Sequence, residues 1–167
     1  CQILGAVVNR TDTEIMYDLI EALEDEMPET HALLSVIPAR DMLSSPTLRE
    51  VADYMGARVL YGGDQLDLLA YNYLVIAMNI PNYLPHLTPN ALLVTPGDRC
   101  EVILSALQAH QSKNYPKIAG LLLTGGLQPP PSVDLLLAGL EGILPILSVS
   151  EDTYQTAMKI GHVPSYI

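Results

Sequence analysis

Two short loops contain the residue types best suited to contact a small anion. They are residues 95–99 (TPGDR) and 124–126 (TGG), and each follows an apolar run that is typical of a buried strand. Arg99 would lie at the start of a helix, where free N–H groups and the helix dipole favour a bound anion. Gly125 and Gly126 carry no side chain and would leave their backbone N–H groups open to the same space. In a functional interpretation, the two loops bind a small phosphate- or carboxylate-bearing ligand.

A structural interpretation of the same loops is also available. Asp98 would cap the helix, Arg99 would pair with a carboxylate across a subunit contact, and the two glycines would supply positive φ in a tight turn. Neither loop has the Lys and hydroxyl that complete a GxxxxGK[ST] phosphate-binding loop. The residues alone therefore favour the structural interpretation, without excluding the ligand.

A third candidate segment is the start of the last helix, residues 151–156 (EDTYQT). It would follow a third strand at the same edge of the sheet, so its carboxylate and hydroxyls would reach that edge. A well-capped helix N-terminus is the more common reason for these residue types, and we favour it. The candidate ligand-binding or interface residues are Asp98, Arg99, Thr124, Gly125, Gly126, Asp152, Thr153 and Tyr154.

The other reactive residue types form no catalytic or metal-binding pattern. The four histidines are scattered, with no HxH or HExxH spacing, which argues against a metal site. Cys100 would lie in the first turn of a helix between two carboxylates, so we expect a packed side chain and not a reactive thiol. No Ser stands in a GxSxG turn, so acyl transfer through a serine has no support. The sequence predicts no catalytic residues, no metal and no cofactor.

Apolar runs and amphipathic segments alternate along the chain, which predicts the elements that would position these loops. Residues 73–78 fit a strand or a helix equally well, but the Asn79 and Pro81 that follow favour a strand and then a helix at 81–87. Such alternation specifies an α/β fold with three layers, α/β/α, and a mostly parallel sheet. Strands are predicted at residues 3–8, 31–37, 57–61, 73–78, 91–95, 118–123 and 144–149.

Capping residues predict where the helices begin. The first predicted helix would end at Pro28 and the second at Gly56, while a later one would span residues 132–140. The expected N-terminal caps are Thr11 (with Glu14), Ser45 (before Pro46), Asp98 (with Glu101) and Ser150.

Composition limits the possible partners. Of 167 residues, 49% are hydrophobic and 16% charged, which predicts a folded core. The net charge of -11 repels phosphate backbones and anionic lipid surfaces, so nucleic-acid binding is not expected, and the apolar runs are too short for membrane insertion. No apolar run reaches ~18 residues and no signal-peptide pattern is present, which predicts a cytoplasmic location. A strand-like run begins almost at Cys1, which suggests that an upstream segment is missing.

The two loops resemble the signature of a known domain. Asp98, Arg99, Thr124, Gly125 and Gly126 spell the motif after which the DRTGG domain is named. The segments PTLREVADYMGARVLYG, LLVTPGDRCEVILSALQA, KIAGLLLTGG and DTYQTA are similar to that domain as it occurs in the N-terminal half of long phosphate acetyltransferases. The resemblance covers residues 42–161.

The resemblance implies two domains. Residues 1–40 resemble the β-α-β tail of a dethiobiotin synthetase-like P-loop domain, with GAVVNR at its base-side Asn loop and LLSVIPAR as its last strand. Residues 42–167 would form the DRTGG domain, whose fold is similar to that of the HPr kinase N-terminal domain. The P-loop and the acetyltransferase catalytic domain are not part of this sequence.

A regulatory role is what the resemblance implies about function. The DRTGG domain is found attached to enzymes and to CBS-domain pyrophosphatases, and it is regarded as a regulatory or oligomerising module with no chemistry of its own. We therefore expect a non-catalytic module that forms a homo-oligomer, dimer or higher, and senses a small anionic metabolite or nucleotide beside Arg99, Gly125 and Gly126. The alternatives are a fragment of an acyl- or phosphoryl-transferring enzyme whose catalytic domain is absent, and a purely structural scaffold.

Overall fold

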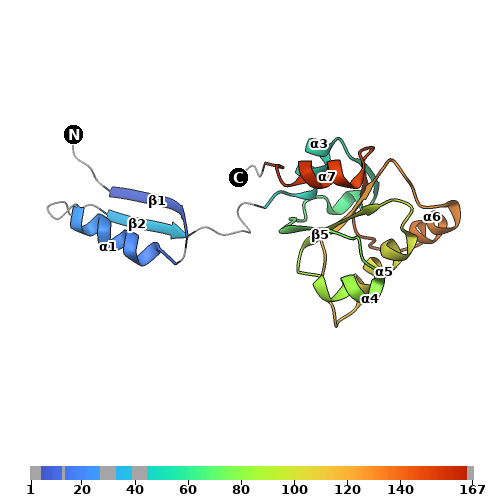
Figure 1. The fold of residues 1–167 in the computed structure, drawn as a ribbon, viewed down its shortest axis with the longest axis horizontal. Coiled ribbons are helices and arrows are strands. Elements are labelled where there is room, and N and C mark those ends of the chain that lie inside the picture. Colours follow the sequence, from blue (N-terminus) through green and yellow to red (C-terminus); the bar gives the residue numbers. More distant parts are fainter. Residues whose placement is uncertain (1–4, 13, 27–32, 39–44, 165–167) are drawn as a thin grey trace. The chain divides into compact units, whose positions relative to one another are not determined.

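The computed structural model describes residues 5–12, 14–26, 33–38 and 45–164. The chain divides into two units, Cys1–Leu43 and Ser44–Ile167 (Figure 1). Each unit contains its own sheet.

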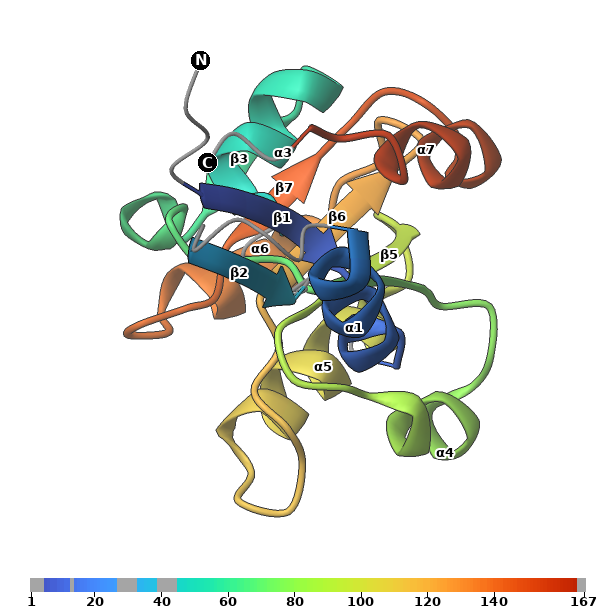
Figure 2. The same cartoon turned by 90° about the vertical axis from the view of Figure 1, so that its left-hand side faces the viewer.

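The first unit is one β-α-β segment. Strand β1 (Gly5–Thr11) pairs in parallel with β2 (Leu33–Pro38), and helix α1 (Met16–Glu26) lies between them in the sequence. Figure 2 shows the two strands side by side. The predicted cap at Thr11 is wrong: Thr11 is the last residue of β1, and the helix begins at Met16. The reason is that Thr11 pairs with Pro38 of β2, which extends the strand beyond the expected helix start.

The second unit is built on a five-stranded sheet with the strand order β3-β7-β6-β5-β4. Strands β4, β5, β6 and β7 are parallel to one another, and the edge strand β3 runs antiparallel to β7. Figure 2 shows β7, β6 and β5 side by side. The prediction of a mostly parallel sheet is confirmed. The strands are β3 Arg58–Tyr61, β4 Asn72–Val75, β5 Ala91–Pro96, β6 Gly120–Thr124 and β7 Ile146–Ser148.

Helices cover both faces of this sheet. On one face, α3 and α7 contribute buried residues such as Val51 and Ile160 to one apolar cluster. On the other face, α4, α5 and α6 contribute residues such as Ile103 and Leu137 to a second cluster. This is the predicted three-layer α/β/α arrangement (Figure 1). The helices are α3 Leu48–Met55, α4 Ile80–Tyr83, α5 Cys100–Gln111, α6 Pro131–Ala138 and α7 Thr153–Ile160, with 3-10 turns η1 Gly63–Gln65 and η2 Leu84–His86.

The central strands are apolar at nearly every position because helices cover both of their faces. Along β5, Leu92 and Val94 join the cluster under α3 and α7, whereas Ala91 and Leu93 join the cluster under α4, α5 and α6. Successive side chains of a strand point to opposite faces, so both sets must be apolar. A buried strand therefore leads into each of the two loops.

The ambiguous segment at residues 73–78 is resolved as a strand. Strand β4 covers its first half and ends at Val75. Helix α4 then begins at Ile80, after the N-cap residue Asn79, and continues into η2. The predicted order of a strand followed by a short helix is therefore correct, with a shorter strand.

Helix α3 begins two residues later than predicted. Its N-cap is Thr47, whose hydroxyl accepts a hydrogen bond from the Glu50 N–H at 3.2 Å, while the Glu50 carboxylate accepts one from the Thr47 N–H at 2.7 Å. The expected cap was Ser45. However, the neighbouring Pro46 carbonyl accepts a hydrogen bond from the Ala70 N–H at 2.9 Å, which keeps this segment extended. A contact with a distant segment therefore decides where the helix starts.

The cap of helix α5 also differs from the prediction. The N-cap is Arg99 instead of Asp98, and within the described residues no side chain caps the helix there. The Arg99 N–H donates to the Pro96 carbonyl at 3.1 Å, and the Cys100 N–H donates to the Asp98 carbonyl at 2.9 Å. These tight turns place Asp98 outside the helix, so the expected capping box with Glu101 does not form.

Candidate functional site

The carboxyl ends of β5, β6 and β7 meet at one edge of the sheet, because these strands are adjacent and parallel. The loop after β5 and the loop after β6 are in direct contact there. The Gly97 N–H donates to the Thr124 carbonyl at 3.2 Å. Gly97 also lies so close to Leu127 that a Cβ at this position would overlap the Leu127 carbonyl oxygen. The two loops, residues 95–99 and 124–126, form one packed structure, which we call the loop edge.

Gly125 and Gly126 use their N–H groups within the chain. The Gly125 N–H donates to the Glu151 carbonyl at 2.6 Å, and the Gly126 N–H donates to the Val149 carbonyl at 2.8 Å. The expectation that these amides are open to a ligand is therefore wrong. Both glycines have positive φ, 81° and 64°, as the structural interpretation of the loop predicts. The loop after β6 is fastened in this way to the connection between β7 and α7.

Arg99 is held by groups of its own chain. Its Nε forms an ion pair with the Glu101 carboxylate, and its Nη2 donates to the Met78 carbonyl at 3.4 Å. Hydrogen bonding from the Arg99 guanidinium is the main reason why the pKa of Glu101 lies below its usual value. The carboxylate beside Arg99 thus belongs to the same helix. Arg99 connects the start of α5 with the segment after β4.

The start of α7 is tied to the end of β6. The Thr124 and Thr153 hydroxyls form a hydrogen bond of 2.7 Å. Asp152 caps the helix, since its carboxylate accepts a hydrogen bond from the Gln155 N–H at 2.8 Å. The predicted cap, Ser150, lies before the helix begins. Tyr154 follows in the first turn, with 75% of its surface exposed.

The structure thus places all eight predicted residues at or next to the loop edge. Thr124, Gly125 and Gly126 contact the connection to α7, directly or through Thr153. Asp98 is exposed on the loop before α5, and Arg99 is turned towards Glu101 and Met78. The hydrogen bonds of Arg99 therefore do not go to residues 124–126, which we call the glycine loop.

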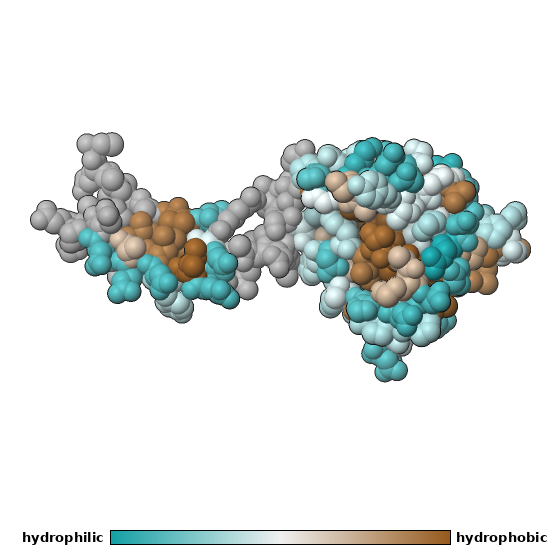
Figure 3. All heavy atoms as spheres, in the orientation of Figure 1, coloured by the Kyte–Doolittle hydropathy of each residue, from teal (hydrophilic) through white to brown (hydrophobic). Residues whose placement is uncertain are grey.

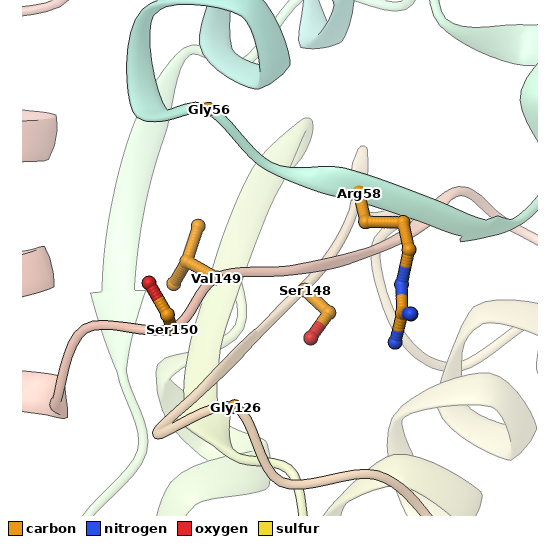
Figure 4. A pocket seen from close by; sticks show the side chains of 6 residues that line it. All are labelled: Gly56, Arg58, Gly126, Ser148, Val149 and Ser150. Atoms are coloured by element: carbon orange, nitrogen blue, oxygen red, sulfur yellow. The ribbon is translucent and has the colours of Figure 1, made fainter.

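A pocket of about 280 Å³ lies beside the loop edge, between β3, β7 and the glycine loop. Figure 4 shows the Arg58 and Ser148 side chains extending from neighbouring strands towards the segment that carries Gly126. The pocket is lined by Gly56, Arg58, Gly126, Ser148, Val149 and Ser150.

Of these residues, the sequence predicted only Gly126. Arg58 and Ser148 come from segments far apart in the chain and become neighbours because β3 pairs antiparallel with β7. The one local signal was a charged residue at the start of a short apolar strand, and that signal does not reveal the partner strand. Sequence reasoning could therefore not assemble this pocket.

Within the described ranges, no group of three or more His, Cys, Asp or Glu side chains is arranged to hold a metal ion. Cys100 is a free, half-buried thiol. No helix in the described part of the chain is long and apolar enough to cross a membrane.

The chain is similar in sequence to phosphate acetyltransferases. The enzyme from Synechocystis sp. is 40% identical over 161 residues, a match that covers 96% of this chain and 23% of that enzyme. The enzyme from Nitratidesulfovibrio vulgaris is 41% identical over 165 residues, with coverage of 96% and 23%. The chain therefore spans about a quarter of the length of the curated relatives it matches.

In fold, the chain resembles the CBS and DRTGG domains of the regulatory region of Clostridium perfringens pyrophosphatase, solved in complex with the activator diadenosine tetraphosphate. The TM-score is 0.54 at 12% identity, covering 99% of this chain and 76% of that chain. The sequence profile of the DRTGG domain matches residues 50–163, which include both loops of the edge. By this match, and by the loops that carry its signature, the chain belongs to the DRTGG domain family.

Proposed function

We propose that this chain is a non-catalytic regulatory module of a phosphate acetyltransferase-like protein, and that it responds to a small anionic metabolite or nucleotide. The observation that carries the non-catalytic part of the proposal is how the signature residues are bonded. Arg99 is paired with Glu101, and the amides of Gly125 and Gly126 are bonded to backbone carbonyls. Covalent catalysis needs a nucleophile beside a base, whereas these arginine and glycine groups bond to neighbouring segments of their own chain.

The relatives support this role. The phosphate acetyltransferases match the chain over only about a quarter of their length, which leaves room for a separate catalytic part in the whole protein. The pyrophosphatase region of similar fold is regulatory and binds a nucleotide activator. In the same proposal, residues 1–40 are the β-α-β tail of a P-loop domain that precedes the module.

The module acts as an oligomer in this proposal. Tyr154 and Met158 lie one turn apart on the same face of α7 and are 75% and 58% exposed. Figure 3 also shows apolar side chains gathered on the visible face of the second unit, surrounded by hydrophilic ones. A second copy of the chain would cover such a surface. A ligand that binds one assembly better than another would then shift the population between them.

The proposal is tested by measuring ligand binding and assembly on the same samples. The 167-residue chain is screened by thermal shift with nucleotides, acyl-CoA compounds and organic acids, and its mass is followed by light scattering. We expect an anionic compound to raise the Tm, because a ligand that binds only the folded state stabilises it, and to change the mass.

Two variants make this test specific. Arg99→Gln should weaken both responses, because it frees Glu101 and loosens the edge. Lys113→Gln removes the same charge from an exposed position in the segment after α5 and should leave both responses unchanged. If Arg99→Gln behaves like the wild type, the loop edge is not the responsive site. If no compound changes the Tm or the mass, the module is a structural scaffold.

A further inference from the structure

Arg58 is an exposed arginine of a strongly acidic chain, and among the described residues it has no ion-pair partner. Arg49, Arg99 and Lys159 each form an ion pair, with Asp67, Glu101 and Glu151 respectively. Within the part of the chain that the structure describes, the Arg58 guanidinium forms neither an ion pair nor a hydrogen bond. The chain has 19 acidic residues and only 8 basic ones, so a missing partner is not due to a shortage of carboxylates.

A hydroxyl lies next to this guanidinium. Arg58 and Ser148 are directly opposite each other across the antiparallel pair of β3 and β7. Residues in such positions project their side chains to the same face of the sheet. Ser148 is 7% exposed, and its hydroxyl has no hydrogen-bond partner among the described residues. Two donors that have no hydrogen-bond partner among the described residues, and that water can reach, therefore point into the same pocket (Figure 4).

The pocket also has room for a ligand. Its volume is about 280 Å³, and two of its lining residues are glycines. A Cβ at Gly56 would meet no atom within 4 Å, and one at Gly126 would come no closer than 3.8 Å to Ser150. The glycines thus leave the walls open, and the size suits a single small group instead of a whole dinucleotide.

The carboxylate of Glu151, which follows the lining residue Ser150, is already neutralised. The Ser150 hydroxyl donates to the Glu151 carboxylate at 3.4 Å, and the same carboxylate forms an ion pair with Lys159 at 2.6 Å. Hydrogen bonding from Lys159 is also the main reason why the pKa of Glu151 is lowered. Glu151 therefore stays charged but compensated, and Arg58 remains the unbalanced charge of the pocket.

We propose that this pocket binds a single phosphoryl group, either as inorganic phosphate or as the phosphate of a small monoester. The planar guanidinium fork of Arg58 can donate two parallel hydrogen bonds to such a group, and the Ser148 hydroxyl can donate a third. A phosphoryl dianion accepts these bonds from several directions, whereas a carboxylate offers only two oxygens in one plane. This pocket proposal rests on the proposed function in one respect, that the ligand is an anion. The phosphate site itself does not depend on Arg99.

The test is the binding of inorganic phosphate and of AMP to the 167-residue chain, measured by isothermal titration at constant ionic strength. Acetate is the control anion. We expect phosphate and AMP to bind, and acetate to bind at least roughly tenfold more weakly. Arg58→Gln should weaken phosphate binding by roughly tenfold or more, because it removes the charge and the fork. Arg58→Lys keeps the charge but not the fork, so its affinity for phosphate should lie between those of the wild type and Arg58→Gln.

Two further variants keep this test specific. Arg49→Gln removes an arginine from an exposed surface pair and should bind phosphate like the wild type. Ser148→Ala should bind phosphate several-fold more weakly, and circular dichroism will show whether it is folded. The proposal is overturned if the wild type binds no phosphate, or if Arg58→Gln and Arg49→Gln bind it equally.

The same titrations separate this proposal from the proposed function. If phosphate binding is lost in Arg99→Gln but kept in Arg58→Gln, the ligand sits at the loop edge, and the pocket assignment is wrong. If it is lost in Arg58→Gln and kept in Arg99→Gln, the pocket is the phosphate site. A chain that binds no phosphate but changes its mass with a carboxylate ligand keeps the regulatory role and rejects the phosphoryl pocket.

Discussion

The hydroxyls of Thr124 and Thr153 lie 2.7 Å apart and join the end of β6 to the first residue of α7. Thr124 is 1% exposed, so its hydroxyl cannot rely on water for a partner. This bond fastens a surface helix to a central strand, next to the glycine loop.

Replacing Thr124 with Val keeps the shape of the side chain but removes the hydroxyl and leaves Thr153 without this partner. We expect the free energy of unfolding to fall by about 1 kcal/mol. Urea unfolding followed by circular dichroism measures it. The double variant Thr124→Val/Thr153→Val should cost less than the sum of the single variants. Strict additivity would mean that the bond adds no stability.

Gly97 allows the loops after β5 and β6 to pack together, because a Cβ there would overlap the Leu127 backbone. Gly97→Ala should therefore destabilise the chain by roughly 2 kcal/mol or more, since backbone atoms must move. Gly161→Ala is the matched control. A Cβ at Gly161 meets nothing within 4 Å and its φ is -66°, so we expect no loss. Equal unfolding midpoints for the two variants would contradict the close packing of the loops.

The cap of α3 can be tested at Thr47, whose hydroxyl accepts a hydrogen bond from the Glu50 N–H. Thr47→Ala should lower the free energy of unfolding by about 1 kcal/mol, because that N–H loses its acceptor. Thr47→Ser keeps the hydroxyl and should remain within a few tenths of the wild-type value. Chemical denaturation of both variants measures the difference, and an equally large loss in Thr47→Ser would point to the methyl group instead of the cap.

His110 makes stability depend on pH. Its Nδ1 accepts a hydrogen bond from the Ile118 N–H at 3.2 Å, and burial, together with the charge of Lys117, lowers the pKa of His110 below 6.5. The unfolded chain therefore binds the proton more readily than the folded chain. This contribution to stability is complete above about pH 6.5 and is lost as the pH falls through the folded-state pKa. The urea midpoint should accordingly fall when the pH is lowered from about 7.5 to about 5.5.

The His110 contribution is isolated by comparing variants. His110→Asn keeps an acceptor near the position of Nδ1 but does not titrate, so its midpoint should fall less over the same pH range. His162→Asn, at an exposed position, should keep the full wild-type dependence. If His110→Asn follows the wild-type curve, another group is responsible for the effect.

The order of elements could be predicted because it depends on local patterns. Residues 91–94 and 118–123 are runs without a polar side chain, and they form β5 and β6 within one or two residues. The loops that follow them carry the family signature in the sequence itself. Their location at one edge follows from two neighbouring parallel strands.

The starts of helices were harder to predict because competing contacts come from elsewhere in the chain. Ser45 and Asp98 are good caps by residue type, yet the pairing of Pro46 with Ala70 and the turn from Pro96 to Cys100 exclude both from that role. The amides of Gly125 and Gly126 are similar. The two glycines predict a turn with positive φ, but whether their N–H groups are free to bind a ligand depends on the carbonyls that approach them from other segments.

The residues alone therefore established the α/β alternation, the two loops and the family to which they belong, since each of these depends on neighbours along the chain. Tertiary structure decided which groups are free to bind a ligand. It occupied Arg99 and the glycine amides, and it placed Arg58 opposite Ser148, with no ion pair or hydrogen bond to either side chain among the described residues. The reason is that β3 and β7 are far apart in the sequence, and no local pattern in either strand records their pairing.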